Sequence, residues 1–194
     1  MSPLPFFLPE VIDKMNILAI DQARNGAWAV ADYDTHELIG YGTFSFDSKK
    51  YTYAKTIMHI EEIISMVIDA YDVEYVAIED IQLRVNAQSF KKLAQLQGVL
   101  VNLCEKDKLL YGLVAPTQWQ NFCKARSRNS KEIANNIKTI DSKKKETKVL
   151  SIQFVKDQYG IETENDNLAD ALCILFYVLN IIEIVPLDEE IKEK

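Results

Sequence analysis

The order of hydrophobic and polar positions predicts three strands near the start of the chain. The predicted strands lie at 16–20, 26–32 and 38–46, and the first of these mainly apolar runs is followed directly by an aspartate. A short polar segment at 33–36 separates the second run from the third and is typical of a turn. Strands joined this closely pair with their neighbours, so we expect an antiparallel meander.

Helical and strand periods then alternate along the chain. The predicted elements are a helix at 51–71, a strand at 73–78, a helix at 89–106 with Ser89 as its N-cap, a strand at 110–114, and helices that begin at Pro116, at 146 and at 165. The sequence therefore predicts an α/β fold in which three antiparallel strands are followed by strands that alternate with helices.

The same pattern divides the chain into three parts. Residues 1–14 hold three of the five prolines and are expected to form an irregular N-terminal arm. Residues 15–182 carry the regular pattern and form one domain, and residues 183–194 form an acidic tail. Within the domain, residues 124–145 are polar and basic with weak periodicity. They predict a long loop, and loops of that length are usually functional.

Composition excludes several classes of protein. A chain of 194 residues that is 48% hydrophobic and 26% charged can bury a core and is neither disordered nor of low complexity. No apolar run reaches the ~18–20 residues that span a bilayer, so no membrane partner is expected. The three cysteines are an odd number without a C-x-x-C motif, which favours a reduced protein in the cytoplasm.

The distribution of charge changes what the net charge implies. A total of −7 argues against nucleic acid as a partner. Residues 82–148, however, hold 14 Lys and Arg against 5 Asp and Glu, a net +9 that leaves −16 for the rest of the chain. A basic middle between acidic ends is compatible with a DNA-binding surface, although a cluster of charges alone is also typical of a solvated face.

Carboxylates follow two of the predicted strands and recur in the last helix. Asp21 ends the first strand and Glu79 ends the fourth, where a sheet meets solvent. Either acid alone could also cap the next turn. Asp166 and Asp170 are four residues apart and so lie on nearly the same face of the last helix. Asp166 also suits a first turn, where it complements the helix dipole, whereas Asp170 lies among residues that must be buried.

Acids that converge in this way raise one another's pKa values unless a cation lies between them. Hard oxygen ligands without Cys or His favour Mg²⁺, or Mn²⁺ in its place, rather than zinc. His36 and His59 show no ligand spacing, and no Ser/His/Asp arrangement is evident. A carboxylate–metal site beside a basic surface suggests phosphodiester chemistry.

Arg84, Lys91 and Lys92 flank the start of a helix, where amide groups and positive charge both favour phosphate.

Taken in order, four segments resemble the RuvC-like Holliday junction resolvases, over about residues 15–182. They are LAIDQARNGAWAV, YVAIEDIQLRVNAQSFKKLAQLQGVL, LVAPTQWQ and LADAL. The resemblance implies a ribonuclease H-like fold with a mixed five-stranded sheet flanked by helices. It also implies an endodeoxyribonuclease of recombination and repair, which works as a homodimer and cuts four-way junctions and other branched DNA by paired hydrolysis.

The resemblance also assigns site residues. Asp21, Glu79 and Asp170 match the metal-binding acids of the family, which hold two ions per active site. The fourth ligand is usually an acid or histidine at the position of Asn167, so we expect Asp166 to take that role, with Asn167 as the alternative. Asp80 should turn to the other side of its strand. A basic segment of the family corresponds to Lys143, Lys144, Lys145 and Lys148, of which Lys145 or Lys148 is expected to hold the scissile phosphate.

The chain also departs from the family pattern. Gln82 replaces an aromatic residue, and the loop after Pro116 is long, with Arg126, Arg128 and Lys131 as candidate phosphate contacts. The helix with Leu93, Leu96, Leu100 and Leu103 is either core or, as in the family, a dimer interface.

The alternative to a nuclease is a branched-DNA-binding protein that is weakly active or inactive, which Asn167 motivates. A sugar-kinase-like fragment fits poorly because the chain has only 6 glycines.

Overall fold

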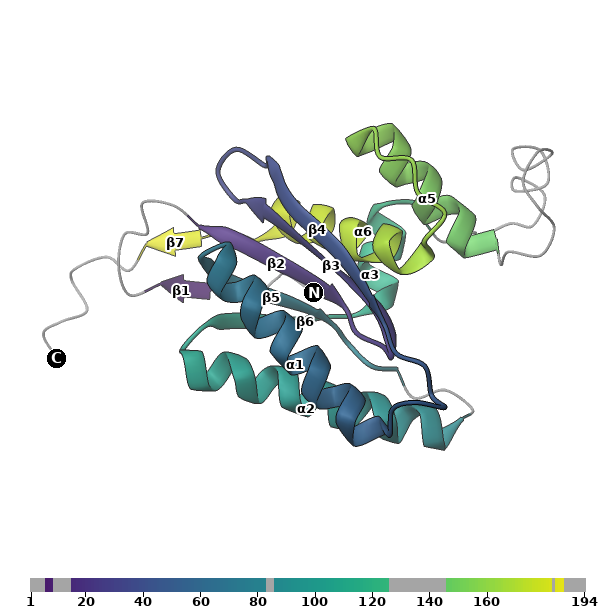
Figure 1. Cartoon of the computed structure of the whole chain (residues 1–194). Helices are drawn as coiled ribbons and strands as arrows, with labels where there is room; N and C mark the ends of the chain where they lie inside the picture. Colours follow the sequence, from purple (N-terminus) through teal and green to yellow (C-terminus); the bar gives the residue numbers. More distant parts are fainter. Residues whose placement is uncertain (1–5, 9–14, 83–85, 126–145, 183, 187–194) are drawn as a thin grey trace, which may run out of the picture.

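Five strands form one sheet at the centre of the protein, in the order β4-β3-β2-β5-β6 (Figure 1). The computed structural model of the chain describes residues 6–8, 15–82, 86–125, 146–182 and 184–186. The strands are β2 (Asn16–Asp21), β3 (Asn25–Asp32), β4 (Leu38–Ser45), β5 (Val73–Glu79) and β6 (Leu110–Val114). β2, β3 and β4 pair antiparallel, whereas β5 pairs parallel with both β2 and β6. The predicted meander and the mixed five-stranded sheet are therefore confirmed.

Helices cover both faces of this sheet (Figure 1). α1 (Tyr53–Ala70) and α2 (Ala87–Asp107) lie on one face, and α3 (Pro116–Phe122), α5 (Glu146–Tyr159) and α6 (Asp166–Ile181) lie on the other. In the part of the chain that the structure describes, no helix is long and apolar enough to cross a membrane.

The central strand β2 supplies both halves of the hydrophobic core. All six of its residues are buried, and successive side chains point to opposite faces. Ile17 and Ala19 join the core under α6, whereas Leu18 and Ile20 join the core under α1 and α2. An unbroken apolar run thus indicates a strand that is covered on both sides.

Small side chains line the sheet face under α6. Ala19 of β2, Ala29 of β3 and Ala77 of β5 are all completely buried there. They meet fully buried residues of α6 such as Ala169 and Leu172. Because interiors are close-packed, a layer of alanines sets a short separation between this helix and the sheet.

The start of α2 differs from the prediction. The N-cap is Asn86, whose side-chain oxygen accepts hydrogen bonds from the amides of Gln88 and Ser89, so Ser89 lies inside the helix and the predicted cap was wrong. Asparagine is as strong an N-cap as serine, and hydrophobic periodicity locates a helix better than it locates the first residue.

The leucine stripe of α2 belongs mainly to the core. Leu96, Leu100 and Leu103 are buried against α1 and the sheet, whereas Leu93 is half-buried. Any dimer contact made by α2 must therefore use its outward side rather than these three leucines.

Short strands also form outside the predicted domain. Phe6–Leu8 (β1) pairs in parallel with Ile184–Pro186 (β7), so a stretch of the arm that we expected to be irregular is a strand in the structure. This contact joins two segments at opposite ends of the sequence, which local patterns do not reveal.

Candidate active site

Two acids lie side by side at one edge of the sheet. Asp21 is the last residue of β2 and Glu79 is the last residue of β5. The two strands are parallel neighbours in which Ile20 aligns with Ile78, so the acids occupy the next aligned positions. The register thus brings together residues that are 58 positions apart in the sequence.

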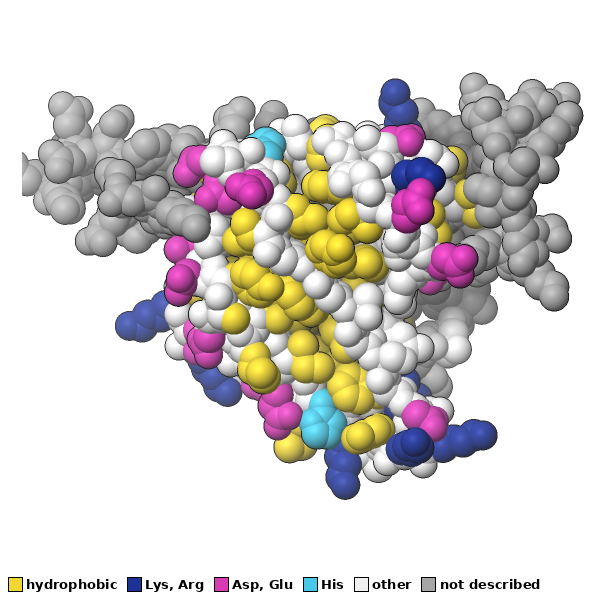
Figure 2. All heavy atoms as spheres, turned by 45° about the horizontal axis from the view of Figure 1, so that its top comes forward, with side chains coloured by type: hydrophobic (Ala, Val, Ile, Leu, Met, Phe, Trp, Pro, Cys, Tyr) yellow, Lys and Arg dark blue, Asp and Glu magenta, His cyan; other side chains and the backbone are white. Residues whose placement is uncertain are grey.

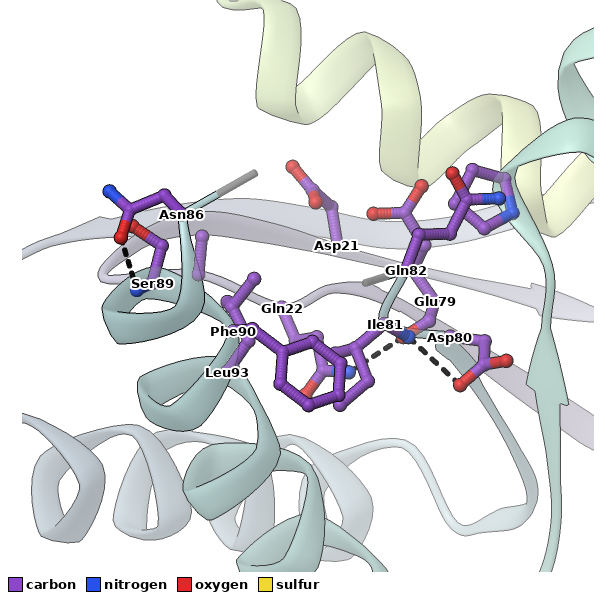
Figure 3. A pocket seen from close by; sticks show the side chains of 12 residues that line it. Asp21, Gln22, Glu79, Asp80, Ile81, Gln82, Asn86, Ser89, Phe90 and Leu93 are labelled. Carbon is purple, nitrogen blue, oxygen red and sulfur yellow. Dashed lines mark hydrogen bonds between the residues drawn. The ribbon is translucent and has the colours of Figure 1, made fainter. Parts of the chain in front are cut away.

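Strand alternation puts both acids on the side of α6. Ala19 and Ala77 face α6, and Asp21 and Glu79 each lie two residues further along the same strands. Figure 3 shows both carboxylates pointing to the same side of a cleft. Asp21 is only 7% exposed, whereas Glu79 is half-buried.

The cleft has a volume of about 400 Å³ and is built mainly by three segments, with Pro116 of α3 added to its lining. One is the turn after β2, the second is the segment after β5, and the third is the first part of α2 (Figure 3). Its lining consists of Asp21, Gln22, Ala23, Glu79, Asp80, Ile81, Gln82, Asn86, Ser89, Phe90, Leu93 and Pro116. The start of a helix favours a phosphate-containing ligand, whereas the two carboxylates accept one beside them only when a cation is bound to them.

Two side chains that sequence reasoning did not single out fix Glu79. The indole Nε1–H of Trp119 donates a hydrogen bond of 3.0 Å to Oε1 of Glu79, and Trp119 is only 2% exposed. Nε2 of Gln22 donates to the backbone oxygen of Glu79 at 2.6 Å. The proline that starts α3 was recognised, but no local signal indicates that a tryptophan three residues later reaches a carboxylate on β5.

Asp80 turns away from this pair, as predicted. Its Oδ1 accepts hydrogen bonds from Nε2 of Gln97 at 3.2 Å and from the amide of Ile81 at 2.8 Å. Gln97 lies on α2, which covers the opposite face of the sheet from α6. Figure 3 shows the Asp80 side chain apart from the carboxylates of Asp21 and Glu79.

The N-terminal end of α6 lies over the sheet edge that carries the strand acids. The Tyr33 hydroxyl donates to the backbone oxygen of Ile182 at 2.9 Å, and the Tyr33 amide donates to the oxygen of Met15 at 2.8 Å. The end of α6 is thereby placed where β2 begins. A helix of 16 residues spans ~24 Å and a strand of 6 residues spans ~20 Å, so α6 starts near the place where β2 ends in Asp21.

Asp166 and Asp170 occupy this N-terminal end. Asp166 is the first residue of α6, where Asn165 caps the helix by accepting hydrogen bonds from the amides of Asn167 and Leu168 at 3.0 and 3.1 Å. Asp170, one turn further on, is half-buried, and the fully buried Cys173 lies one turn beyond it. The contact with Cys123 has the largest effect in raising the pKa of the Cys173 thiol, and burial and the nearby Asp170 carboxylate raise it further.

Fold and register thus direct four acids to one edge and one face of the sheet. Within the described ranges, no three Asp, Glu, His or Cys side chains are arranged closely enough to hold a metal ion as they stand. The donor set itself fits a hard divalent cation, because it consists of carboxylate oxygens, with the Asn167 amide oxygen nearby.

The predicted basic residues are only partly described. Lys91 and Lys92 are exposed near the start of α2, beside the cleft. Lys148 lies in α5, and its side chain is outside the described part. Entirely outside the described residues are Arg84, Arg126, Arg128, Lys131, Lys143, Lys144 and Lys145.

Sheet order, helix layers and strand-end acids define a protein of the ribonuclease H-like class. The model of one family of this class, described as crossover junction endodeoxyribonuclease RuvC, matches residues 17–174. The chain belongs to this RuvC family.

Individual relatives agree with this assignment. The crossover junction endodeoxyribonuclease RuvC of a Nitratiruptor species is 31% identical over 142 residues, which cover 71% of this chain and 89% of that protein. The counterpart from a Sulfurovum species is 30% identical over 142 residues and is covered to 88% of its length.

Solved structures show the same fold. Thermus thermophilus RuvC in complex with a Holliday junction substrate has a TM-score of 0.60 at 13% identity and covers 84% of this chain and 91% of its own. The fowlpox virus resolvase in complex with Holliday junction DNA has a TM-score of 0.53 at 13% identity, over 86% of this chain and 97% of its own. The expected ribonuclease H-like fold is therefore confirmed.

Proposed function

We propose that this protein is a divalent-metal-dependent endodeoxyribonuclease that resolves four-way DNA junctions and other branched DNA. The observation that carries the proposal is the pairing of Asp21 with Glu79 at the ends of parallel neighbours, on the face covered by the acidic end of α6. Membership of the RuvC family supplies the reaction and the class of substrate.

Four acids would hold the metal. These are Asp21, Glu79, Asp170 and Asp166, with Asn167 as the alternative to Asp166. Two bound Mg²⁺ or Mn²⁺ ions would supply an activated water and stabilise the leaving oxygen of the cut strand. Trp119 and Gln22 hold Glu79 in place through the hydrogen bonds described above, so the carboxylate is oriented before the substrate arrives.

Basic residues would bind the DNA backbone. Lys145 or Lys148 is proposed to hold the scissile phosphate, since both belong to the basic segment that precedes or begins α5. The remaining proposed DNA contacts are Arg84, Lys91, Lys92, Arg126, Arg128, Lys131, Lys143 and Lys144. Their positive charge would make binding strongly dependent on salt.

A labelled four-way junction incubated with increasing Mg²⁺ or Mn²⁺ tests the proposal. Asp21→Asn and Glu79→Gln should abolish cutting and leave binding equal or tighter, because a negative charge near phosphate is removed. Asp107→Asn, at the last residue of α2 and outside the lining of the cleft, is the matched control, and it should cut like the natural protein. Continued cutting by both Asp21→Asn and Glu79→Gln would refute the assignment.

The alternative is a branched-DNA-binding protein without cutting activity. It is not favoured, because the matched family consists of endonucleases and Asp21, Glu79 and Asp170 are all present. Binding without nicking at every metal concentration in the same assay would establish this alternative.

We further propose that the protein acts as a homodimer, because resolving a junction needs two symmetric cuts and a two-fold dimer places two active sites symmetrically. Light scattering on the purified protein measures this directly. A monomer that nonetheless makes paired cuts would contradict the proposal.

A further inference from the structure

A cationic cluster lies beside the cleft and belongs to three separate elements. Arg24 is in the turn after β2, Tyr53 begins α1, and Lys92 is near the start of α2. The guanidinium carbon of Arg24 is 5.7 Å from the centroid of the Tyr53 ring, and Nζ of Lys92 is 5.6 Å from the same centroid. Two cations thus share one aromatic ring.

Hydrogen bonds hold the cluster together. Nη1 of Arg24 donates to the backbone oxygens of Phe46 and Tyr51 at 3.4 and 3.3 Å. The Tyr53 hydroxyl donates to the backbone oxygen of Lys92, which ties α1 to α2. These contacts use one nitrogen of the guanidinium, and an arginine carries five N–H donors in all. Lys92 is exposed and its ammonium carries three more donors.

Arg24 and Lys92 bring two positive charges to one ring, and this charge favours an anion that contacts them. The ring itself attracts each cation only weakly, by roughly 0.5–1 kcal/mol at an exposed site. A phosphate, in contrast, accepts charge-assisted hydrogen bonds from both an arginine and a lysine. The cluster therefore has the chemistry of a phosphate site.

The cluster is continuous with the cleft. Ala23, the neighbour of Arg24, lines the cleft, and so do Phe90 and Leu93, which flank Lys92 on α2. A DNA strand that leaves the acids in this direction would meet the two cations next.

Three aromatic side chains adjoin the same cluster, since Arg24 donates to the backbone oxygens of Phe46 and Tyr51. The rings of Phe46 and His59 are stacked, with centroids 5.8 Å apart and planes 9° apart. Tyr51 meets both edge-on, at 5.6 and 5.5 Å. All three side chains are half-buried, so each keeps part of its surface in contact with solvent. Figure 2 shows hydrophobic side chains exposed across one face of the molecule, with Lys, Arg, Asp and Glu side chains around them.

We propose that Arg24 and Lys92, positioned by Tyr53, bind a backbone phosphate of the DNA strand next to the cleft, and that the Phe46–Tyr51–His59 surface stacks on an unpaired base of that strand. This inference rests on the proposed nuclease function, because it assumes DNA in the cleft. Aromatic rings that reach solvent beside cations are typical of sites that bind single-stranded nucleic acid.

Binding of fluorescein-labelled DNA, measured by anisotropy without divalent metal over a range of salt concentrations, tests the phosphate site. Arg24→Gln and Lys92→Gln should each weaken binding to junction and single-stranded DNA and make the slope of log K against log salt shallower by about 1. Lys106→Gln, the same change in the last turn of α2, is the control and should leave the slope unchanged. Slopes of Arg24→Gln and Lys92→Gln equal to that of the control would overturn the phosphate site.

A single strand that contains one 2-aminopurine tests the stacking surface. The natural protein should quench its fluorescence, and His59→Ala or Tyr51→Ala should remove the quenching, with circular dichroism confirming that each variant is folded. The stacking proposal would be overturned if the natural protein did not quench the fluorescence, or if both variants quenched it as strongly as the natural protein does. These outcomes are independent of cutting, so failure of this inference is distinguishable from failure of the nuclease assay above.

Discussion

Trp119→Phe is a direct test of how the protein orients Glu79. The substitution keeps an aromatic ring in a site that is 2% exposed and removes the Nε1–H that donates to Oε1 of Glu79 at 3.0 Å. A hydrogen bond to a charged group contributes about 1.5–3 kcal/mol. Since about 1.4 kcal/mol is a factor of ten, the expected loss is about ten- to a hundredfold, the range typical of residues that orient metal ligands.

The loss should appear in the response to metal rather than in the response to DNA. We expect single-turnover cutting of a four-way junction by Trp119→Phe to need about 10–100 times more Mg²⁺ for half of the maximal rate, or to reach a maximal rate lower by that factor. Binding of the junction without metal should stay unchanged, because Trp119 is buried and contacts Glu79 rather than the surface that would meet DNA.

Trp28→Phe is the matched control. Trp28 is on β3, but its ring lies on the α1 side of the sheet against Tyr71, with centroids 5.7 Å apart. The same chemical change there should alter stability without altering the metal titration. A folded Trp119→Phe protein whose titration coincides with that of Trp28→Phe would refute the positioning role of the indole.

Four further predictions concern packing and burial. Gly98→Ala should stabilise the protein by about 1 kcal/mol in urea unfolding, since a Cβ on this exposed position of α2 meets no atom within 4 Å. Gly26→Ala should destabilise it by about 1–3 kcal/mol, since its Cβ would clash with the backbone oxygen of Asp21. Burial raises the pKa of Tyr75 to about 12, above the ~10 of an unfolded chain. The unfolded state therefore loses this proton first, and the free energy of unfolding should fall as the pH rises from about 10 to about 12. A free energy of unfolding that stays constant over this range in urea titrations would contradict the prediction. Burial also raises the pKa of the Cys104 thiol to about 12. A disulfide-exchange reagent at pH 8 should therefore label Cys104 only after unfolding. Labelling of Cys104 in the native protein would contradict this prediction.

Much of the fold follows from local patterns. The apolar run that ends in Asp21 and the one that ends in Glu79 each predict a strand, and the tight connections that follow the first predict the meander. The same periodicity also gives the facing of Asp80, because alternation along a strand is a local property. Features of this kind depend on residues that are close together in the sequence.

The remaining features depend on contacts between distant residues. Trp119 is 40 positions from Glu79, and only the folded chain brings its indole to that carboxylate. Arg24 and Lys92 come from different elements that meet at Tyr53, which no pattern in either segment indicates. The N-cap at Asn86 was missed for another reason, since both Asn and Ser are good caps and the choice depends on the chain before the helix.

The alanines between α6 and the sheet act as a spacer for chemistry that they never touch. Strand acids and helix acids belong to separate elements, so the thickness of the layer between them fixes how far apart their oxygens are. One extra methyl group at Ala19, Ala29 or Ala77 would push the helix outward, while a metal–oxygen bond tolerates only a few tenths of an ångström. Variation at these three positions should therefore tune catalysis from inside the core.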